Sequence, residues 1–287
     1  MAMTFHTSAA DLAKPQQGGL PAGPFASGRQ NLALTRPPAQ AGEMDHFPLA
    51  DSRRIAFRFT PGIEPALVFL PGYMSDMAGS KATALFDAAH AAGRACLLLD
   101  YSGCGASDGD FADGTLSRWR DEVLALVAAQ GLGRMVLVGS SMGGWLMLLV
   151  ALALGPERVA GLVGIAAAPD FTRWSYSPAQ QAELAAGHTI FEDNPYGPDP
   201  TPTHARFWAD GERNRLLDGV IAIDCPVRLL HGQTDGDVPW DLSLRLAGTL
   251  RSADVQVTLV KDGDHRLSRE ADIALIVRTV FALAEAA

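Results

Sequence analysis

Apolar positions from about residue 45 to the C-terminus follow two alternating patterns. Short runs of Val, Leu, Ile and Ala suit buried strands, and most are followed by longer segments with apolar residues at helical spacing. Strands that alternate with crossover helices are typical of a mostly parallel sheet flanked by helices. The sequence therefore predicts an α/β fold. The expected strands of this sheet are 66–70, 95–100, 135–139, 159–166, 227–231 and 255–260.

Residues 54–60 (RIAFRFT) alternate in polarity, which predicts an antiparallel edge strand. Helical spacing predicts a helix that is capped by Asp113 or Thr115 and runs to Gln130. The longest apolar stretch, 145–154, is shorter than the roughly 20 residues that a bilayer-spanning helix needs, so we expect a buried core helix and no stable membrane insertion. Further helices are expected at about 80–92, 141–154, 240–250 and 270–284.

An aromatic- and proline-rich segment at about 171–219 breaks this alternation. It matches no strand period, so we expect a cap inserted into a single domain that spans 45–287. Its five prolines are accompanied by Trp174, Tyr176, Tyr196, Phe207 and Trp208.

The first 44 residues are rich in Ala, Pro, Gly and Gln and contain few large apolar side chains. Such a segment cannot bury enough surface to offset its ordering entropy, so we expect a flexible N-terminal arm over 1–44. Up to Arg36 it carries three bases and one acid, a composition that faintly resembles an organellar transit segment. It has no apolar core of the kind that a secretory signal needs.

The whole chain of 287 residues has a net charge of −9, with 48% hydrophobic and 19% charged residues. This composition is typical of a soluble globular protein, and an acidic surface repels phosphate backbones, so we expect no nucleic-acid partner. Cys96, Cys104 and Cys225 show neither a disulfide framework nor zinc-ligand spacing. We therefore expect a reduced compartment and cytoplasmic localisation, with an organellar transit segment as the alternative.

The run Gly139-Ser140-Ser141-Met142-Gly143-Gly144 lies directly between an expected strand and an expected helix. It matches the G-x-S-x-G turn, in which a strained backbone holds the middle serine clear of the strand end. Glycines flank the turn because its two sides approach closely. We interpret Ser141 as a nucleophile. Ser140 sits one position early, and the plainer alternative is a glycine-rich turn with an idle serine.

A serine hydroxyl needs a neighbouring base to become a nucleophile, and in this type of fold the base follows last in the chain. We expect His265, in a turn between the last strand and the last helix, to be that base. His188 and His204 lie in the expected cap. His231 ends a strand and is interpreted as a packed or hydrogen-bonded core residue.

The acid that orients the base is expected in the loop 231–239 (HGQTDGDVP). Asp235 comes first, near the strand end, and is the preferred candidate. Asp237 is the alternative, although its position suits a cap for the helix that begins near Trp240. Asp262 and Asp264 adjoin the histidine and are interpreted as solvated turn residues.

Two backbone N–H groups are expected to form an oxyanion hole: that of Met142, and that of Tyr73 in the loop after strand 66–70. An apolar acyl pocket, or alternatively the core of the cap, is expected to contain Met74, Trp174, Trp208 and Trp240.

Several stretches together resemble one branch of the α/β-hydrolases, the mitochondrial palmitoyl-protein thioesterase that is also a mycophenolic acid acyl-glucuronide esterase, with its bacterial relatives. The resemblance spans about residue 66 to the C-terminus and implies hydrolysis of esters or thioesters, with its motif positions on Ser141, Asp235 and His265. The arm has no matching motif and the cap matches poorly. The stretches are 69–74 (FLPGYM), 100–109 (DYSGCGASDG), 138–147 (VGSSMGGWLM), 225–240 (CPVRLLHGQTDGDVPW) and 264–266 (DHR).

We therefore expect an α/β-hydrolase fold with a catalytic triad, and a serine hydrolase that cleaves a carboxylic ester or thioester through an acyl-enzyme. The substrate would be a small-molecule ester or thioester, or an S-acylated protein, and no metal or organic cofactor is needed. The same fold also hosts lyases and cofactor-free peroxidases, and non-catalytic binding proteins. These remain the alternatives.

Overall fold

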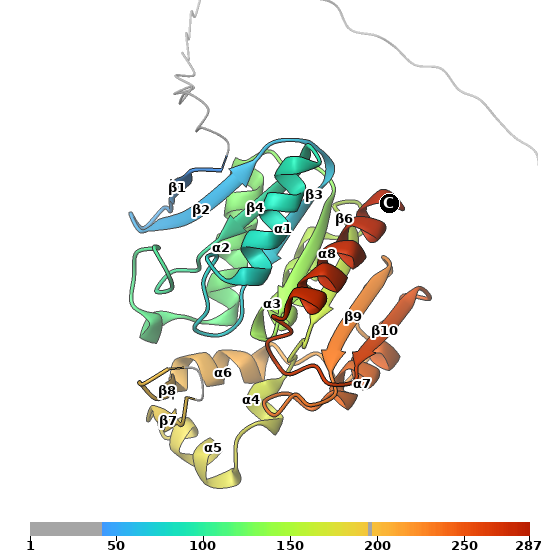
Figure 1. Ribbon diagram of the computed structural model, residues 1–287. Helices are drawn as coiled ribbons and strands as arrows, with labels where there is room; N and C mark the ends of the chain where they lie inside the picture. The colour runs from blue at the N-terminus through green and yellow to red at the C-terminus, as the bar shows by residue number, and fades with distance from the viewer. Residues whose placement is uncertain (1–41, 195–196) are drawn as a thin grey trace, which may run out of the picture. The chain divides into compact units, whose positions relative to one another are not determined.

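A computed structural model describes residues 42–194 and 197–287, and these contain one large sheet of eight strands. The strand order is β1-β2-β4-β3-β5-β6-β9-β10 (Figure 1). From β4 to β10 all neighbours pair in parallel, whereas β1 and β2 are antiparallel additions at one side. The strands are β1 (Met44–Pro48), β2 (Arg54–Thr60), β3 (Ile63–Leu70), β4 (Arg94–Leu99), β5 (Met135–Ser140), β6 (Val159–Ile165), β9 (Val227–Gly232) and β10 (Val255–Val260).

The mostly parallel sheet confirms the predicted fold class. The predicted position of one strand within the sheet was wrong. The strand expected at the sheet edge, β2, lies second, because Met44–Pro48 forms an additional strand outside it. That outer strand is short and ends in proline, so it lacks the periodicity that identifies a strand. The predicted arm, 1–44, lies outside the described residues except for its last three positions.

Helices cover both faces of the sheet, as predicted. One face carries α1 (Ser80–Ala91) and α8 (Glu270–Glu285), which lie in front of the sheet in Figure 1. The opposite face carries α2 (Leu116–Ala129), α3 (Met142–Leu154) and α7 (Asp241–Thr249). Successive residues of a strand point to opposite faces, so β3 supplies Leu67 and Phe69 to the first layer and Val68 and Leu70 to the second.

The structure shows which residue caps α2 and how deeply α3 is buried. Thr115, rather than Asp113, caps α2, with its hydroxyl oxygen accepting the N–H of Arg118 at 3.1 Å. Every residue of α3 from Met142 to Ala151 is buried, which confirms the predicted core helix. None of the described helices is both long and apolar enough to cross a bilayer. All three cysteines are free thiols.

Residues 171–219, the segment predicted as a cap, lie between β6 and β9. The described part of this segment, 171–194 and 197–219, contains five short elements. Its two strands pair with each other in a separate small sheet. The buried carboxylate of Asp210 joins the segment to α2, because it accepts the N–H and the hydroxyl of Ser117 at 2.8 and 2.9 Å. The elements are α4 (Phe171–Trp174), α5 (Pro178–Ala185), β7 (Ile190–Glu192), β8 (Thr201–Thr203) and α6 (Ala205–Arg213).

Two helical glycines differ in their surroundings and provide a test of the packing around α3. A Cβ atom on Gly143 would lie 2.1 Å from the carbonyl oxygen of Leu70, whereas one on Gly248 in α7 would meet no atom within 4 Å. We expect Gly143→Ala to lower the free energy of unfolding by about 2 kcal/mol or more through overpacking. Gly248→Ala should raise it by about 0.5–1 kcal/mol. Urea unfolding of the two variants measures both effects, and equal stabilities would contradict this account.

Candidate active site

Ser141 occupies the sharp turn between β5 and α3. Its φ of 55° and ψ of −121° place a non-glycine residue in a strained part of backbone space. The two sides of the turn nearly touch, since a Cβ atom on Gly139 would lie 2.3 Å from the carbonyl oxygen of Gly143. Only glycine fits at that position, and the turn holds Ser141 on the wall of a pocket. This geometry is the one that the G-x-S-x-G spacing predicts.

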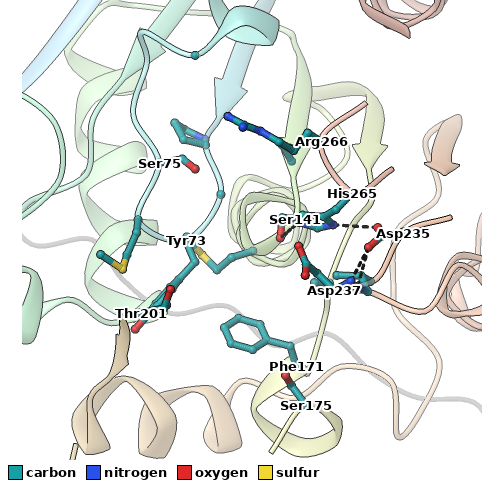
Figure 2. Close-up of a pocket in the computed structure, with 18 of the residues that line it drawn as sticks. Tyr73, Ser75, Ser141, Phe171, Ser175, Thr201, Asp235, Asp237, His265 and Arg266 are labelled. Carbon is teal, nitrogen blue, oxygen red and sulfur yellow. Dashed lines mark hydrogen bonds and ion pairs between the residues drawn. The ribbon is translucent and has the colours of Figure 1, made fainter. Parts of the chain in front are cut away.

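His265 and Asp235 lie in line with this serine. The Nε2 atom of His265 is 3.1 Å from Ser141 Oγ, and its Nδ1 atom is 2.8 Å from Asp235 Oδ2 (Figure 2). His265 comes from the loop between β10 and α8, and Asp235 from the loop after β9. Three segments that are far apart in the sequence therefore meet, and two consecutive hydrogen bonds link their side chains. The structure brings together the three residues that the sequence analysis selected.

The carboxylate of Asp235 is fully enclosed and strongly held. Its side chain is 0% exposed, and its Oδ1 atom accepts the N–H groups of Asp237 and Val238 at 2.9 and 2.8 Å. Burial alone would raise the pKa of Asp235, but hydrogen bonds from His231 and His265, the charge of His265 and the Val238 N–H together hold it well below its usual range. Asp235 is thus a permanent anion at neutral pH.

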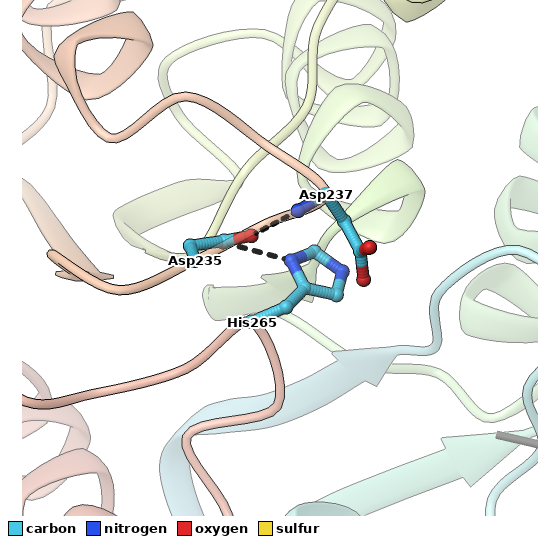
Figure 3. A group of neighbouring side chains, drawn as sticks. All are labelled: Asp235, Asp237 and His265. Atoms are coloured by element: carbon cyan, nitrogen blue, oxygen red, sulfur yellow. Dashed lines mark hydrogen bonds and ion pairs between the residues drawn. The ribbon is translucent and has the colours of Figure 1, made fainter. Parts of the chain in front are cut away.

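The alternative acids lie elsewhere. Asp237 does not cap α7 as expected, because Trp240 occupies the N-cap position and no side chain bonds there. Its carboxylate instead lies on the side of the His265 ring away from Asp235 (Figure 3). Asp264 accepts the N–H of Leu267, and Asp262 pairs with Arg269.

The alternative histidines also have other partners. His188 pairs with Glu183, and His204 contacts the hydroxyl of Thr189, both in the segment 171–219. His231 is a buried, hydrogen-bonded residue, as expected, but one of its partners is Asp235. No sequence pattern connected these two residues. The available signal was their spacing, because His231 is the last but one residue of β9 and Asp235 follows four residues later.

Asp235, Asp237 and His265 also form a group that offers one ligand atom each, all within 4.8 Å of one another (Figure 3). A cation at this point would compete with bonds already made. Both nitrogens of His265 are used, one toward Asp235 and one toward Ser141, and both oxygens of Asp235 already accept two N–H groups each. The donor set therefore favours proton transfer over cation binding.

The loop after β3 lies against Ser141. A Cβ atom on Gly72 would be 3.4 Å from the Cβ of Ser141, which is ordinary van der Waals contact, so the two segments pack closely at this point. Among the described residues, no backbone hydrogen bond uses the N–H of Tyr73 or of Met142, the two groups predicted to bind an oxyanion. Both residues line the pocket beside Ser141.

Two tyrosine hydroxyls hold this loop from opposite sides. Tyr101, at the end of β4, donates to the carbonyl oxygen of Pro71 at 3.1 Å. Tyr73 itself donates to the carbonyl oxygen of Pro202 in β8 at 3.0 Å. The Tyr73 ring also packs against Phe207 of α6, with ring centroids 4.8 Å apart. The loop is therefore attached both to the sheet and to the segment 171–219.

A pocket of about 1080 Å³ opens above Ser141. Of the four side chains predicted to line it, Met74 and Trp174 do so. Trp208 does not, because its indole N–H donates to Thr172 and its ring packs in the core of the segment 171–219, the alternative that the sequence left open. Trp240 does not line it either, since it begins α7 outside the pocket. These two assignments are corrected.

Lys81, in the first turn of α1, lies at the pocket and was not singled out by any sequence pattern. Its ammonium group donates to the carbonyl oxygen of Arg266, next to His265. Burial lowers the pKa of Lys81 to about 8, and the charge of Arg266 acts in the same direction, whereas Asp264 and Asp272 oppose it. Lys81 and Arg266 both line this part of the pocket, and both are cationic at neutral pH.

Comparison with known proteins identifies the family to which this fold belongs. Residues 67–278 match the model of the alpha/beta hydrolase family. The chain belongs to the alpha/beta hydrolase family. Human mitochondrial palmitoyl-protein thioesterase ABHD10 is 38% identical over 234 residues, which cover 80% of this chain and 76% of that protein. Hydrolase chemistry is the activity that this membership and these relatives support.

Two solved structures share both fold and sequence with this member of the family. A hydrolase-like protein from Agrobacterium vitis S4 is 38% identical, with a TM-score of 0.80, over 85% of this chain and all of that one. Mouse alpha/beta hydrolase domain-containing protein 10 is 37% identical, with a TM-score of 0.78, over 84% of this chain and 98% of that one. The predicted resemblance and fold are thereby confirmed.

The names of the relatives contradict the predicted cytoplasmic localisation. The human and mouse thioesterases are mitochondrial proteins by name. The prediction is therefore wrong, and the reason is physical: net charge and cysteine pairing describe the folded domain, whereas a targeting segment decides the compartment. The alternative of a transit segment falls on residues outside those that the structure describes.

A pair of tyrosine variants tests how the loop after β3 is attached. Tyr73→Phe keeps the ring packing and removes the donor to Pro202, so we expect a loss of about 1 kcal/mol in stability and faster amide hydrogen exchange in β7 and β8. Tyr101→Phe removes the donor to buried Pro71 and should leave exchange in β7 and β8 unchanged. Hydrogen exchange measured by mass spectrometry distinguishes them, and equal protection of β7 and β8 in both variants would contradict the attachment.

Proposed function

We propose that this chain is a serine hydrolase that cleaves carboxylic esters or thioesters through an acyl-enzyme. The observation that carries the proposal is the chain of contacts from Ser141 Oγ to His265 Nε2 at 3.1 Å and from His265 Nδ1 to Asp235 at 2.8 Å. It lies in a pocket beside two backbone N–H groups that no described residue uses. These contacts support the roles of nucleophile for Ser141, base for His265, orienting acid for Asp235 and oxyanion donors for the two N–H groups.

In the first half of the reaction, Ser141 Oγ attacks the acyl carbonyl carbon while His265 Nε2 takes the hydroxyl proton. The carbonyl oxygen gains the negative charge and is held by the N–H groups of Met142 and Tyr73. Asp235 stabilises the imidazolium, because it is ionised and accepts the Nδ1–H. The tetrahedral centre then collapses, and His265 gives its proton to the leaving alcohol or thiol.

In the second half, water replaces the leaving group. His265 removes a proton from the water as it attacks the acyl carbon of the Ser141 ester, and the same two N–H groups hold the new oxyanion. Collapse returns the proton from His265 to Ser141 Oγ and releases the carboxylic acid. His265 carries every proton that moves, and all of the groups that assist the reaction are residues of this chain.

The substrate class is drawn from the relatives and the pocket. The curated relatives are palmitoyl-protein thioesterases by name, and Phe171, Trp174 and Met142 give the pocket apolar walls that suit an acyl chain. We propose a small-molecule ester or thioester, or an S-acylated protein, as the substrate.

Replacement of the nucleophile tests the function. Ser141→Ala should lower kcat on a p-nitrophenyl ester by about 10⁴-fold or more, because the members of a triad act as a unit. The wild-type chain should form a covalent adduct with a fluorophosphonate probe at Ser141, and peptide mass spectrometry locates it. Ser140→Ala is the matched control and should keep both activity and labelling. Normal hydrolysis by Ser141→Ala would refute the mechanism, and an unlabelled wild-type chain would favour a binding protein.

The two candidate acids are distinguished by matched amide substitutions. Asp235→Asn should reduce kcat by about 10³–10⁴-fold, because an amide can neither stabilise the imidazolium nor enforce the same tautomer. Asp237→Asn should reduce it by less than about tenfold, since its side chain does not bond to His265 Nδ1. Steady-state kinetics on one ester measure both variants. The opposite order would assign the orienting role to Asp237.

A further inference from the structure

A buried histidine, His231, lies directly behind Asp235. It stands at the carboxyl end of β9 and is 0% exposed. Its Nε2 atom is 3.0 Å from Asp235 Oδ2 and 3.1 Å from the carbonyl oxygen of Val238, and its Nδ1 atom is 2.8 Å from Ser243 Oγ in α7. Both ring nitrogens therefore have partners, in a place where an unpaired polar atom would be costly.

The partners of His231 fix the position of its proton. The carboxylate of Asp235 and the carbonyl of Val238 can only accept, so Nε2 must carry a hydrogen. The neutral ring then has a lone pair on Nδ1, which accepts the hydroxyl proton of Ser243. The hydrogen bonds run in one direction, from Ser243 through His231 to Asp235. Ser243 is itself 1% exposed, so water does not compete for this contact.

Two histidines therefore share one oxygen of Asp235. His231 Nε2 and His265 Nδ1 both lie within 3.0 Å of Oδ2, while Oδ1 accepts two backbone N–H groups. Any rotation of the carboxylate would break several of these bonds at once. His231 does not line the pocket, and its hydrogen-bond partners among the described residues are Asp235, Val238 and Ser243, so Asp235 is the group that links it to His265.

We propose that His231, oriented by Ser243, is a positioning residue for hydrolysis: it fixes Oδ2 of Asp235 at the point from which the carboxylate holds the His265 imidazole against Ser141. This inference rests on the proposed serine hydrolase function. A loosely held carboxylate lets the imidazole swing, and misplacement by about 1 Å is enough to cost about 100-fold in rate. Substrate binding does not depend on it, so the effect falls on kcat.

Removal of His231 also changes the charge that His265 feels. With one N–H donor fewer, the negative charge on Oδ2 acts more strongly on His265, which favours the imidazolium form. The acid limb of the kcat/KM profile should therefore move to higher pH. The charged groups around His265 are Asp235 and Asp237 from the loop after β9, its chain neighbours Asp264 and Arg266, and Lys81 from α1. None of these is altered by the substitution.

The test compares two replacements of the same residue. His231→Leu removes the donor and should lower kcat by about 10–100-fold at unchanged KM, with the acid limb shifted upward. His231→Gln places an amide N–H near the position of Nε2 and should restore kcat to within a few fold and return the acid limb to its wild-type position. Circular dichroism and thermal unfolding establish that each variant is folded.

Ser243→Ala is the second variant, which keeps the test decisive if His231→Leu does not fold. It removes the partner of Nδ1 and should lower kcat several-fold with KM unchanged. Its matched control is Ser102→Ala, which deletes another buried hydroxyl, one without a hydrogen-bond partner among the described residues. That control should keep the wild-type kcat.

Each outcome bears on one of the two proposals. Wild-type kcat in His231→Leu and Ser243→Ala, an unmoved acid limb in His231→Leu, or equal damage by Leu and Gln would overturn the positioning role. All kinetics are normalised to the fraction of Ser141 that a fluorophosphonate titrates. If Ser141 is not titrated in the wild-type chain, the serine hydrolase function fails instead, so the two failures are distinguishable.

Discussion

The strained backbone at Ser141 is the constraint on which the rest of the site depends. A positive φ at a non-glycine residue persists only where its surroundings hold it in place, and here β5, α3 and the close contact between Gly139 and Gly143 do so. The helix behind the turn, α3, is buried from Met142 to Ala151 through an unbroken apolar run. The loop that carries Gly72 packs within van der Waals contact of Ser141.

A second constraint concerns charge rather than shape. A carboxylate with no exposed surface is stable as an anion only when its oxygens are saturated with donors. Asp235 meets this condition with two backbone N–H groups on one oxygen and two imidazoles on the other. Orientation and ionisation of this residue thus have a single physical origin. The loop that follows β9 returns two of its own N–H groups to the side chain that it carries.

Two kinds of feature could be predicted from the sequence: elements with a regular apolar period, and the tight turn whose backbone requires glycine. Alternating apolar runs are enough to predict the parallel strands, and the glycine spacing is enough to locate Ser141. The outer strand at Met44–Pro48 has no such signal, since pairing with β2 creates it. Trp208 illustrates a second limit: apolar character predicts burial, but it does not say whether a ring faces a pocket or the core beneath it. The link from His231 to Asp235 depends on the path of a loop, which no periodicity describes.

Tyr73 belongs to two parts of the molecule at once. Its backbone lies beside Ser141, while its ring and hydroxyl are held by α6 and β8. A change of sequence in the segment 171–219 that alters the room for a substrate therefore also acts on the loop next to Ser141. We expect substrate selectivity and turnover to change together in this chain. A segment grafted from another family member would need to keep the residues that contact Tyr73. New substrate preferences would then evolve through changes that leave these contacts intact.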